Sequence, residues 1–190
     1  MPFNLLLTGR PGIGKTTVMR KVAAHLGNQA GGFYTEEVRE GRRRVGFQVV
    51  TLEGERAWLA HTKFRSRYRV GKYGVDLAAF ERLVIPTLRH ALAHKRVILV
   101  DEIGPMELFS SAFVQMVTEL LDSQRSLIAT VMAKRHPWVD AVKTRDDVEV
   151  WEVTTANRDA LPERVLAWLH QAGGTSLFLN ARTPQESRLR

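Results

Sequence analysis

The sequence contains no cysteine among its 190 residues, so neither a disulfide framework nor a cysteine-ligated zinc site can form. The six histidines are not expected to pair on one helix face, which argues against a histidine-built metal centre. No apolar run approaches the roughly 18 residues of a membrane span. The apolar run at the start of the chain ends at Thr8-Gly9-Arg10, and it is not preceded by the positively charged residues of a secretory signal peptide. We therefore expect a cytoplasmic protein that does not enter a membrane.

The length is that of one domain, and no linker divides the chain. We expect one domain over residues 1–172 and a basic, mobile tail over residues 173–190. The formal net charge of +8 is typical of a nucleic-acid-binding protein, but it is equally compatible with a small anionic substrate. The basic residues are scattered, with local clusters that include residues 42–44 and 63–72. Nucleic acid is therefore not favoured as a partner, and nothing in the pattern indicates an oligomeric state.

Short apolar runs alternate with segments of helical periodicity. We expect strands over residues 3–8, 97–100, 127–132 and 148–153, and helices over residues 15–26, 76–95, 112–121 and 159–170. Pro86 should break or kink the second helix. Period-two alternation over residues 31–60 predicts an inserted antiparallel meander, and residues 70–74 should form a loop. The pattern predicts an α/β fold with a mostly parallel sheet flanked by helices.

A glycine-rich segment after the first expected strand matches the G-x-x-x-x-G-K-[ST] pattern without a mismatch: Gly9, Arg10, Pro11, Gly12, Ile13, Gly14, Lys15 and Thr16. Glycines let the backbone curl so that successive N–H groups point at phosphate oxygens. The first turn of the following helix, which contains Thr17, adds its free N–H groups. Lys15 supplies a charge for the β- and γ-phosphates, and Thr16 offers a hydroxyl to Mg²⁺. The alternative is a chance glycine-rich turn, but strand, loop and helix follow in the order that phosphate binding requires.

Two acidic residues, Asp101 and Glu102, directly follow the apolar run of residues 97–100. In P-loop enzymes an aspartate at a strand end holds Mg²⁺. Because neighbouring side chains of a strand point in different directions, Glu102 is free to polarise the water that attacks the γ-phosphate. A solvated strand end is the alternative. A glutamate that activates water suits hydrolysis better than phosphoryl transfer to a second nucleotide.

Two further pairs of residues follow later strands. Asn157 and Arg158 lie where P-loop proteins often contact the base: Arg158 could stack on a purine and Asn157 could hydrogen-bond to its edge. A helix cap and a surface charge explain this pair equally well. Lys134 and Arg135 are candidates for contact with the γ-phosphate, as in an arginine finger, with a solvated basic loop as the alternative.

Several of these stretches together resemble the thermophile-type nucleoside-triphosphatase family, which includes the human cancer-related nucleoside-triphosphatase. The matching segments are spread over about residues 4–170: Thr8–Thr17, Gly32–Arg39, Val45–Phe47, Tyr73–Asp76, Asp101–Glu107 and Thr155–Asp159. The combination of Gly-Phe-Tyr-Thr-Glu-Glu with Asp-Glu-Ile-Gly-Pro-Met-Glu is far more specific than the phosphate loop alone. The resemblance implies a RecA-like P-loop core. It also implies slow, Mg²⁺-dependent hydrolysis of several nucleoside triphosphates, ATP and GTP among them, to diphosphates, with weak discrimination among bases.

We therefore predict a nucleoside-triphosphatase that uses Mg²⁺. Lys15 and Glu102 are the expected catalytic residues, Thr16 and Asp101 the expected metal ligands, and residues 9–17 with Asn157 and Arg158 the expected nucleotide-binding residues. A nucleotide or small-molecule kinase would share the phosphate loop but need an acceptor. A nucleic-acid-dependent ATPase would be stimulated by RNA or DNA.

Overall fold

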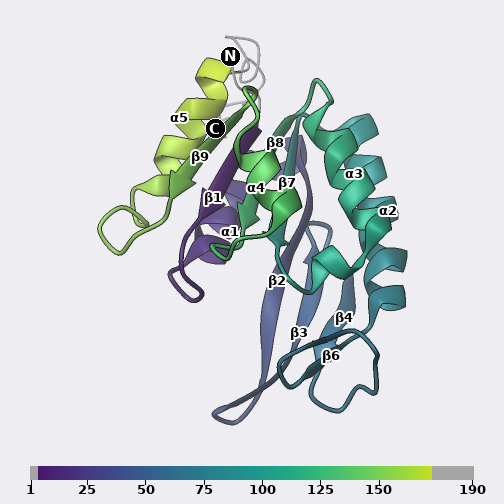
Figure 1. Cartoon of the computed structure of the whole chain (residues 1–190). Helices are drawn as coiled ribbons and strands as arrows, with labels where there is room; N and C mark the ends of the chain where they lie inside the picture. Colours follow the sequence, from purple (N-terminus) through teal and green to yellow (C-terminus); the bar gives the residue numbers. More distant parts are fainter. Residues whose placement is uncertain (1–3, 173–190) are drawn as a thin grey trace, which may run out of the picture.

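A computed structural model of the chain describes residues 4–172, in which strands and helices alternate (Figure 1). The strands are β1 (Asn4–Thr8), β2 (Ala30–Glu40), β3 (Arg43–Thr51), β4 (Arg56–His61), β5 (Arg69–Val70), β6 (Tyr73–Val75), β7 (Val97–Ile103), β8 (Ser126–Val131) and β9 (Val148–Glu152). The helices are α1 (Lys15–Leu26), α2 (Leu77–His94), α3 (Ser111–Leu121), α4 (Pro137–Lys143) and α5 (Leu161–Ala172), with short 3₁₀ helices η1 (Gly27–Gln29) and η2 (Glu107–Phe109). The prediction for residues 173–190 lies outside the described residues.

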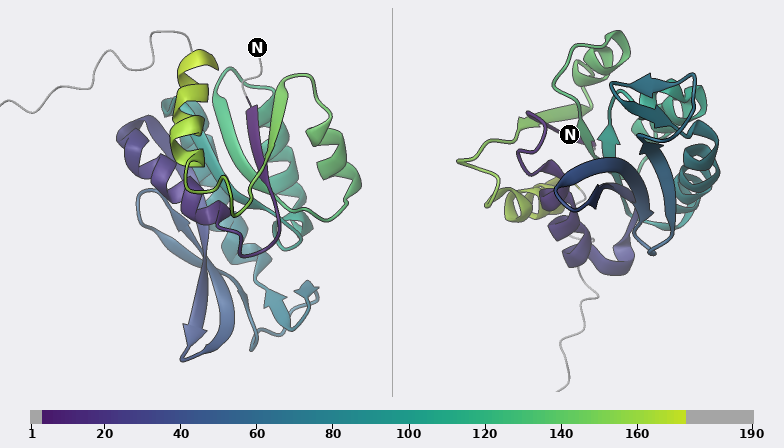
Figure 2. Two further views of the ribbon diagram at one scale, coloured as in Figure 1. Left: turned by 90° about the vertical axis from the view of Figure 1, so that its left-hand side faces the viewer. Right: turned by 90° about the horizontal axis from the view of Figure 1, so that it is seen from below.

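The nine strands of residues 4–172 form one sheet with the order β5-β6-β4-β3-β2-β7-β8-β1-β9. Strands β2, β7, β8, β1 and β9 run parallel, and β3, β4, β6 and β5 continue the sheet as an antiparallel meander. Strand β2 belongs to both parts, because residues 30–33 pair with β7 and residues 33–40 pair with β3. The predicted α/β class and the meander are confirmed. The β2–β3 hairpin projects from the sheet at the same end of the molecule as β6 (Figures 1 and 2).

Helices cover both faces of the sheet because its parallel strands are apolar on both sides. In β1, Leu6 faces a core that also contains residues of α2, α3 and α4, whereas Leu5 and Leu7 face a second core with α1 and α5. All three leucines are fully buried. Burial of each contributes roughly 1.5–3 kcal/mol to folding. Figure 2 shows α1 and α5 together on one side of the sheet.

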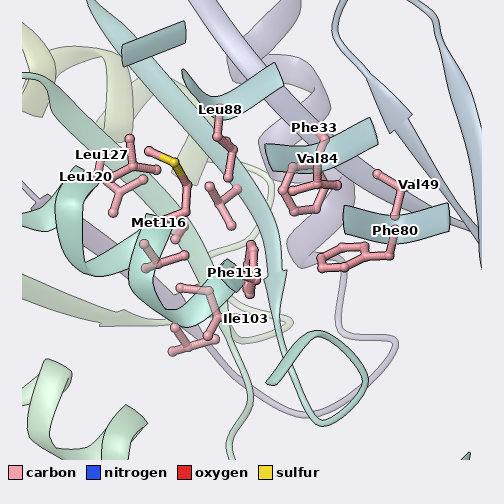
Figure 3. Packing of buried hydrophobic residues seen from close by; sticks show 14 of the residues in the cluster. Phe33, Val49, Phe80, Val84, Leu88, Ile103, Phe113, Met116, Leu120 and Leu127 are labelled. Carbon is pink, nitrogen blue, oxygen red and sulfur yellow. The ribbon is translucent and has the colours of Figure 1, made fainter. Parts of the chain in front are cut away.

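Three phenylalanines join β2, α2 and α3 in the first of these cores. Phe33, Phe80 and Phe113 are fully buried, and each pair of rings meets edge to face (Figure 3). The ring centroids lie 6.2, 6.1 and 5.3 Å apart, a spacing that adds to the hydrophobic contribution of burial. This contact holds α2 and α3 against β2, the strand that also supplies Thr35 to the site described below.

Of the break or kink expected at Pro86, the break does not occur, because helix α2 is continuous through this residue. Proline removes the hydrogen bond to the carbonyl of Arg82. Both Pro86 and Arg82 are exposed, however, so water can hydrate that carbonyl. The buried side of the helix, which includes Val84 and Leu88, continues past the proline and holds the helix on the sheet.

Smaller differences concern the meander, the histidines and one further helix. Residues 69–75 supply the short strands β5 and β6, where only a loop was expected. Helix α4 had no counterpart in the sequence prediction. His90 and His94 lie one turn apart on α2 with ring centroids 4.6 Å apart, so the expectation of unpaired histidines is wrong. Residues 4–172 contain no helix long and apolar enough to cross a membrane.

Candidate active site

The predicted site residues gather at one edge of the sheet, where the parallel strands end. The connection after β1 leads to α1 on one face, whereas the connection after the neighbouring strand β8 leads to α4 on the other face. Connections that diverge in this way open a crevice at the carboxyl ends of the strands, which is the usual ligand position in open α/β sheets. Strand β7, with Asp101 and Glu102, lies next to β8.

The phosphate loop curls between β1 and α1 because three of its glycines have positive φ: Gly9 (147°), Gly12 (76°) and Gly14 (114°). Gly9 also passes close to other backbone, since a Cβ there would lie 2.8 Å from the carbonyl oxygen of Val153. Ile13 is buried and anchors the loop in the core formed with α1 and α5. Within the described residues, no side chain caps the start of α1. Its first N–H groups are therefore available to an anion.

Lys15 lies over this loop. Its Nζ donates a hydrogen bond to the carbonyl oxygen of Gly9 at 3.0 Å, and the residue is 7% exposed. The Oε1 atom of Glu102 lies 4.0 Å from the same Nζ. The lysine of the loop and the glutamate at the end of β7 thus face each other, although they are far apart in the sequence.

A β-bulge in β7 sets the directions of its two acidic side chains. The register between β7 and β8 shifts so that Asp101 and Glu102 together stand opposite the single residue Thr130. A bulge interrupts the regular alternation of side chains and re-aims them. Asp101 points into the protein, where it is 1% exposed, and Glu102 points toward Lys15.

Asp101 is held by hydroxyl and backbone donors. The Thr130 hydroxyl donates to its Oδ1 at 2.6 Å, the Thr35 N–H approaches its Oδ2 at 3.4 Å, and the Thr16 hydroxyl bonds to the same carboxylate. Thr35 also donates its hydroxyl to the Asp101 carbonyl at 2.8 Å. Burial raises the pKa of Asp101, while these hydrogen bonds and the charge of Lys15 act in the opposite direction. Thr16 and Asp101, the expected metal ligands, are therefore brought together.

Glu102 shares its surroundings with a second glutamate, Glu107 of η2. A Cβ on Gly104 would lie 3.0 Å from Oε2 of Glu107 and 3.5 Å from Cδ of Glu102, so both side chains pack over Gly104. Burial raises the pKa of Glu102, against the charge of Lys15. Glu107 is 4% exposed, and its burial together with the charge of Glu102 raises its pKa to about 8.

Three residues at the site were not predicted from the sequence: Thr35, Thr130 and Glu107. Thr35 and Glu107 belong to the two most specific stretches of the family resemblance, which was the available signal. Thr130 lies inside an apolar strand, and its pairing with Asp101 depends on the neighbouring position of β7 and β8. No local pattern could have identified it.

Asn157 and Arg158 lie between β9 and α5. The amide of Asn157 accepts the N–H of Thr154 and donates to the carbonyl of Glu152, both at 2.8 Å, so it shapes its own loop. Arg158 donates from Nη1 to the carbonyl of Ile13 at 3.3 Å. The structure thus places Arg158 directly against the phosphate loop.

Lys134 and Arg135 follow β8 at the same edge of the sheet, and both are exposed. The Arg135 side chain is 95% exposed, and its Nε lies 3.5 Å from Oδ2 of Asp140. Among the hydrogen bonds and ion pairs of residues 4–172, none joins either residue to the phosphate loop. Their contact with a γ-phosphate stays a prediction.

The family model described as NTPase matches residues 4–166. The chain belongs to the NTPase family. A nucleoside-triphosphatase THEP1 from Thermotoga petrophila is 48% identical over 164 residues, which cover 86% of this chain and 91% of that protein. The human cancer-related nucleoside-triphosphatase is 42% identical over 177 residues, covering 85% of this chain and 93% of the human protein.

Solved structures of this family share the fold. The crystal structure of THEP1 from Aquifex aeolicus matches with a TM-score of 0.81 and 39% identity, covering 87% of this chain and 98% of that one. The solution structure of a human cancer-related nucleoside triphosphatase matches with a TM-score of 0.77 and 40% identity, covering 88% and 97%. The P-loop NTPase core and the enzyme class predicted from the sequence are therefore confirmed.

Proposed function

We propose that this NTPase hydrolyses ATP, GTP and other nucleoside triphosphates to diphosphate and phosphate, that the reaction requires Mg²⁺, and that it discriminates weakly among bases. The observation that carries the proposal is the position of Glu102. It directly follows the buried Asp101 and lies 4.0 Å from the charged end of Lys15. A carboxylate at this place is positioned to orient a water against the terminal phosphate.

Triphosphate binding would rest on the loop backbone, the first turn of α1 and Lys15. The free N–H groups and the positive end of the helix dipole attract the β- and γ-phosphate oxygens. Lys15 already lies over the loop through its bond to Gly9 and needs only to turn toward the phosphates. Phosphoryl transfer depends mainly on such positioning and on charge stabilisation.

Thr16 and Asp101 are the residues that would hold Mg²⁺. Hydroxyl and carboxylate oxygens are the hard donors that Mg²⁺ prefers, and Thr35 and Thr130 fix the carboxylate in place. Residues 4–172 contain no group of three or more His, Cys, Asp or Glu that could hold a metal. A larger cluster is not required, because Mg²⁺ in nucleotide sites is usually bound by one or two protein carboxylates together with phosphates. When bound, the ion neutralises charge on the β- and γ-phosphate oxygens.

Glu102 would act as the general base. Its side chain is 35% exposed, so water reaches it. Burial raises the pKa of the carboxyl, which makes its carboxylate a stronger proton acceptor at neutral pH than an exposed glutamate. The water gives its proton to Glu102 as its oxygen bonds to the γ-phosphorus, and the bond to the diphosphate breaks.

Weak discrimination among bases is supported by the loop after β9. Both ends of the Asn157 amide are engaged within that loop, which leaves it poorly placed to recognise a base edge. Arg158 presents a planar guanidinium beside the phosphate loop. Stacking on a guanidinium does not depend on the donors and acceptors of the base, because every base has a π-face.

The test is the Glu102→Gln variant, assayed for phosphate release and for binding of a non-hydrolysable triphosphate analogue with Mg²⁺. Glutamine keeps the size of the side chain but cannot accept the proton. We expect turnover to fall by about 10²-fold or more while analogue affinity is retained. Glu119→Gln, a change at an exposed residue of α3, is the matched control. Parental turnover of Glu102→Gln would exclude the water-activating role. A parent that forms the diphosphate only after addition of an acceptor, with the phosphoryl group on that acceptor and no free phosphate, would be a kinase.

A further inference from the structure

A groove of about 880 Å³ lies beside the segment between β4 and β5. One wall is this segment, residues 63–68, and the other is formed by the start of α2, by Phe109 of η2 and by Ser111. Figure 1 shows the segment and η2 at the same end of the molecule. We call this feature the loop groove. It is separate from the phosphate loop, none of whose residues line it.

The segment along the groove is strongly basic. Residues 63–72 contain five basic residues and no acidic one: Lys63, Arg65, Arg67, Arg69 and Lys72. All five are exposed, and none forms a salt bridge with any residue of the described chain. In the neighbouring strands β2–β4, Arg39 and Arg44 pair with Glu37 and Arg56 pairs with Glu36, whereas Arg42 and Arg43 at the β2–β3 turn form no salt bridge within the described chain. The segment along the groove thus differs from these strands in having no carboxylate partner for any of its five basic residues within the described chain.

Two acidic residues, Asp76 and Glu81, also line the groove, but both are partly buried and bonded to the protein. The Asp76 carboxylate accepts the N–H of Ala79 at 2.9 Å and caps α2. The Glu81 carboxylate accepts the Ser110 hydroxyl at 2.6 Å. The exposed rim of the groove is therefore cationic.

Aromatic rings are interleaved with these cations. Phe109 is 38% exposed, and its ring lies 5.3 Å from that of Tyr68. The Arg67 guanidinium lies 4.8 Å from the centre of the Tyr68 ring. An exposed ring beside a track of cations is the arrangement with which proteins bind single-stranded nucleic acid: bases stack on the rings while the cations follow the phosphates.

We propose that the loop groove binds single-stranded nucleic acid, with Lys63, Arg65 and Arg67 at the phosphates and Phe109 stacked on a base. Three cations along one wall, none of them in a salt bridge within the described chain, exceed what a single phosphate group requires, which favours a strand over a mononucleotide. A duplex keeps its bases paired and stacked, so its bases do not reach Phe109. The site is independent of the phosphate loop and of hydrolysis.

The test measures fluorescence anisotropy of a labelled single-stranded RNA of mixed sequence, about 12 nucleotides long, with the full chain. Arg65→Ala/Arg67→Ala removes two charges from the groove. Arg42→Ala/Arg43→Ala removes two exposed charges at the β2–β3 turn and is the matched control. Each phosphate contact contributes about 0.7 to the slope of log affinity against log salt concentration. The groove variant should bind more weakly with a slope smaller by about 1.4, and the control should bind as the parent does.

Phe109→Ala tests stacking without a change in charge. Its Kd should rise by roughly 5- to 150-fold, the effect of losing one stacked base, with an unchanged salt slope. Phosphate release by all variants checks that they are folded. Equal losses in the groove and control variants would overturn the proposal. So would equal affinity for a duplex of the same length, displacement by a mononucleotide as effective as by the strand, or tighter binding of polyglutamate than of RNA.

Discussion

Glu107 links the electrostatics of the site to protein stability. Its pKa is raised from 4.5 to about 8, chiefly because it is buried and secondly because Glu102 is negatively charged. Between these pH values the folded protein retains a proton that the unfolded chain has released. Raising the pH through this window therefore destabilises the folded state. The contribution of protonated Glu107 to stability is fully present below about pH 4.5 and is lost as the pH rises to about 8.

The size of this effect follows from the shift. The difference between 8 and 4.5 is about 3.5 units, and each unit corresponds to about 1.36 kcal/mol, which bounds the effect at about 5 kcal/mol. Between about pH 5 and about pH 7.5 the free energy of unfolding should fall by roughly 3 kcal/mol because of Glu107 alone. That is a large part of the 5–15 kcal/mol typical of a domain.

Glu107→Gln should remove this pH dependence. Glutamine keeps the shape of the side chain and a carbonyl oxygen that can accept the N–H of Gly104, but it cannot ionise. The free energy of unfolding of the variant minus that of the parent should therefore be roughly 3 kcal/mol larger at about pH 7.5 than at about pH 5. Urea unfolding followed by tryptophan fluorescence at both pH values measures this difference, with the exposed Glu119→Gln as control. A difference from the parent that is the same at both pH values would refute the reasoning.

Two further predictions concern the phosphate loop and the metal. Lys15→Ala removes the charge over the loop, so turnover should fall by roughly 10²-fold or more and triphosphate affinity in calorimetry should drop, whereas Lys21→Ala on the exposed side of α1 should retain both. Near-parental turnover of Lys15→Ala would mean that the loop does not bind the triphosphate. Phosphate release should stop in excess chelator and return with Mg²⁺ or Mn²⁺, and Asp101→Asn should raise the Mg²⁺ concentration needed for half-maximal rate. Undiminished release in chelator would contradict the metal assignment.

Features that depend on neighbours in the chain were predictable from the sequence. The phosphate loop follows from glycines at fixed spacing, since positive φ values and free N–H groups are properties of a few consecutive residues. The β2–β3 turn and the Asp76 cap of α2 also arise within a few residues. Pro86 shows the limit of such reasoning, because packing on the sheet outweighs a local preference for a break.

The contacts that assemble the site were decided only by the tertiary structure. That Glu102 faces Lys15 depends on β7, β8 and β1 lying side by side, and the bulge that aims Glu102 exists only relative to the partner strand β8. The burial of Glu107 likewise depends on how η2 packs against the sheet edge. The same holds for the basic residues. Their number is known from the sequence, but which of them form a salt bridge with a carboxylate depends on the fold. Backbone conformational preferences are set by a few neighbouring residues, whereas these contacts arise from the packing of elements that are distant in sequence.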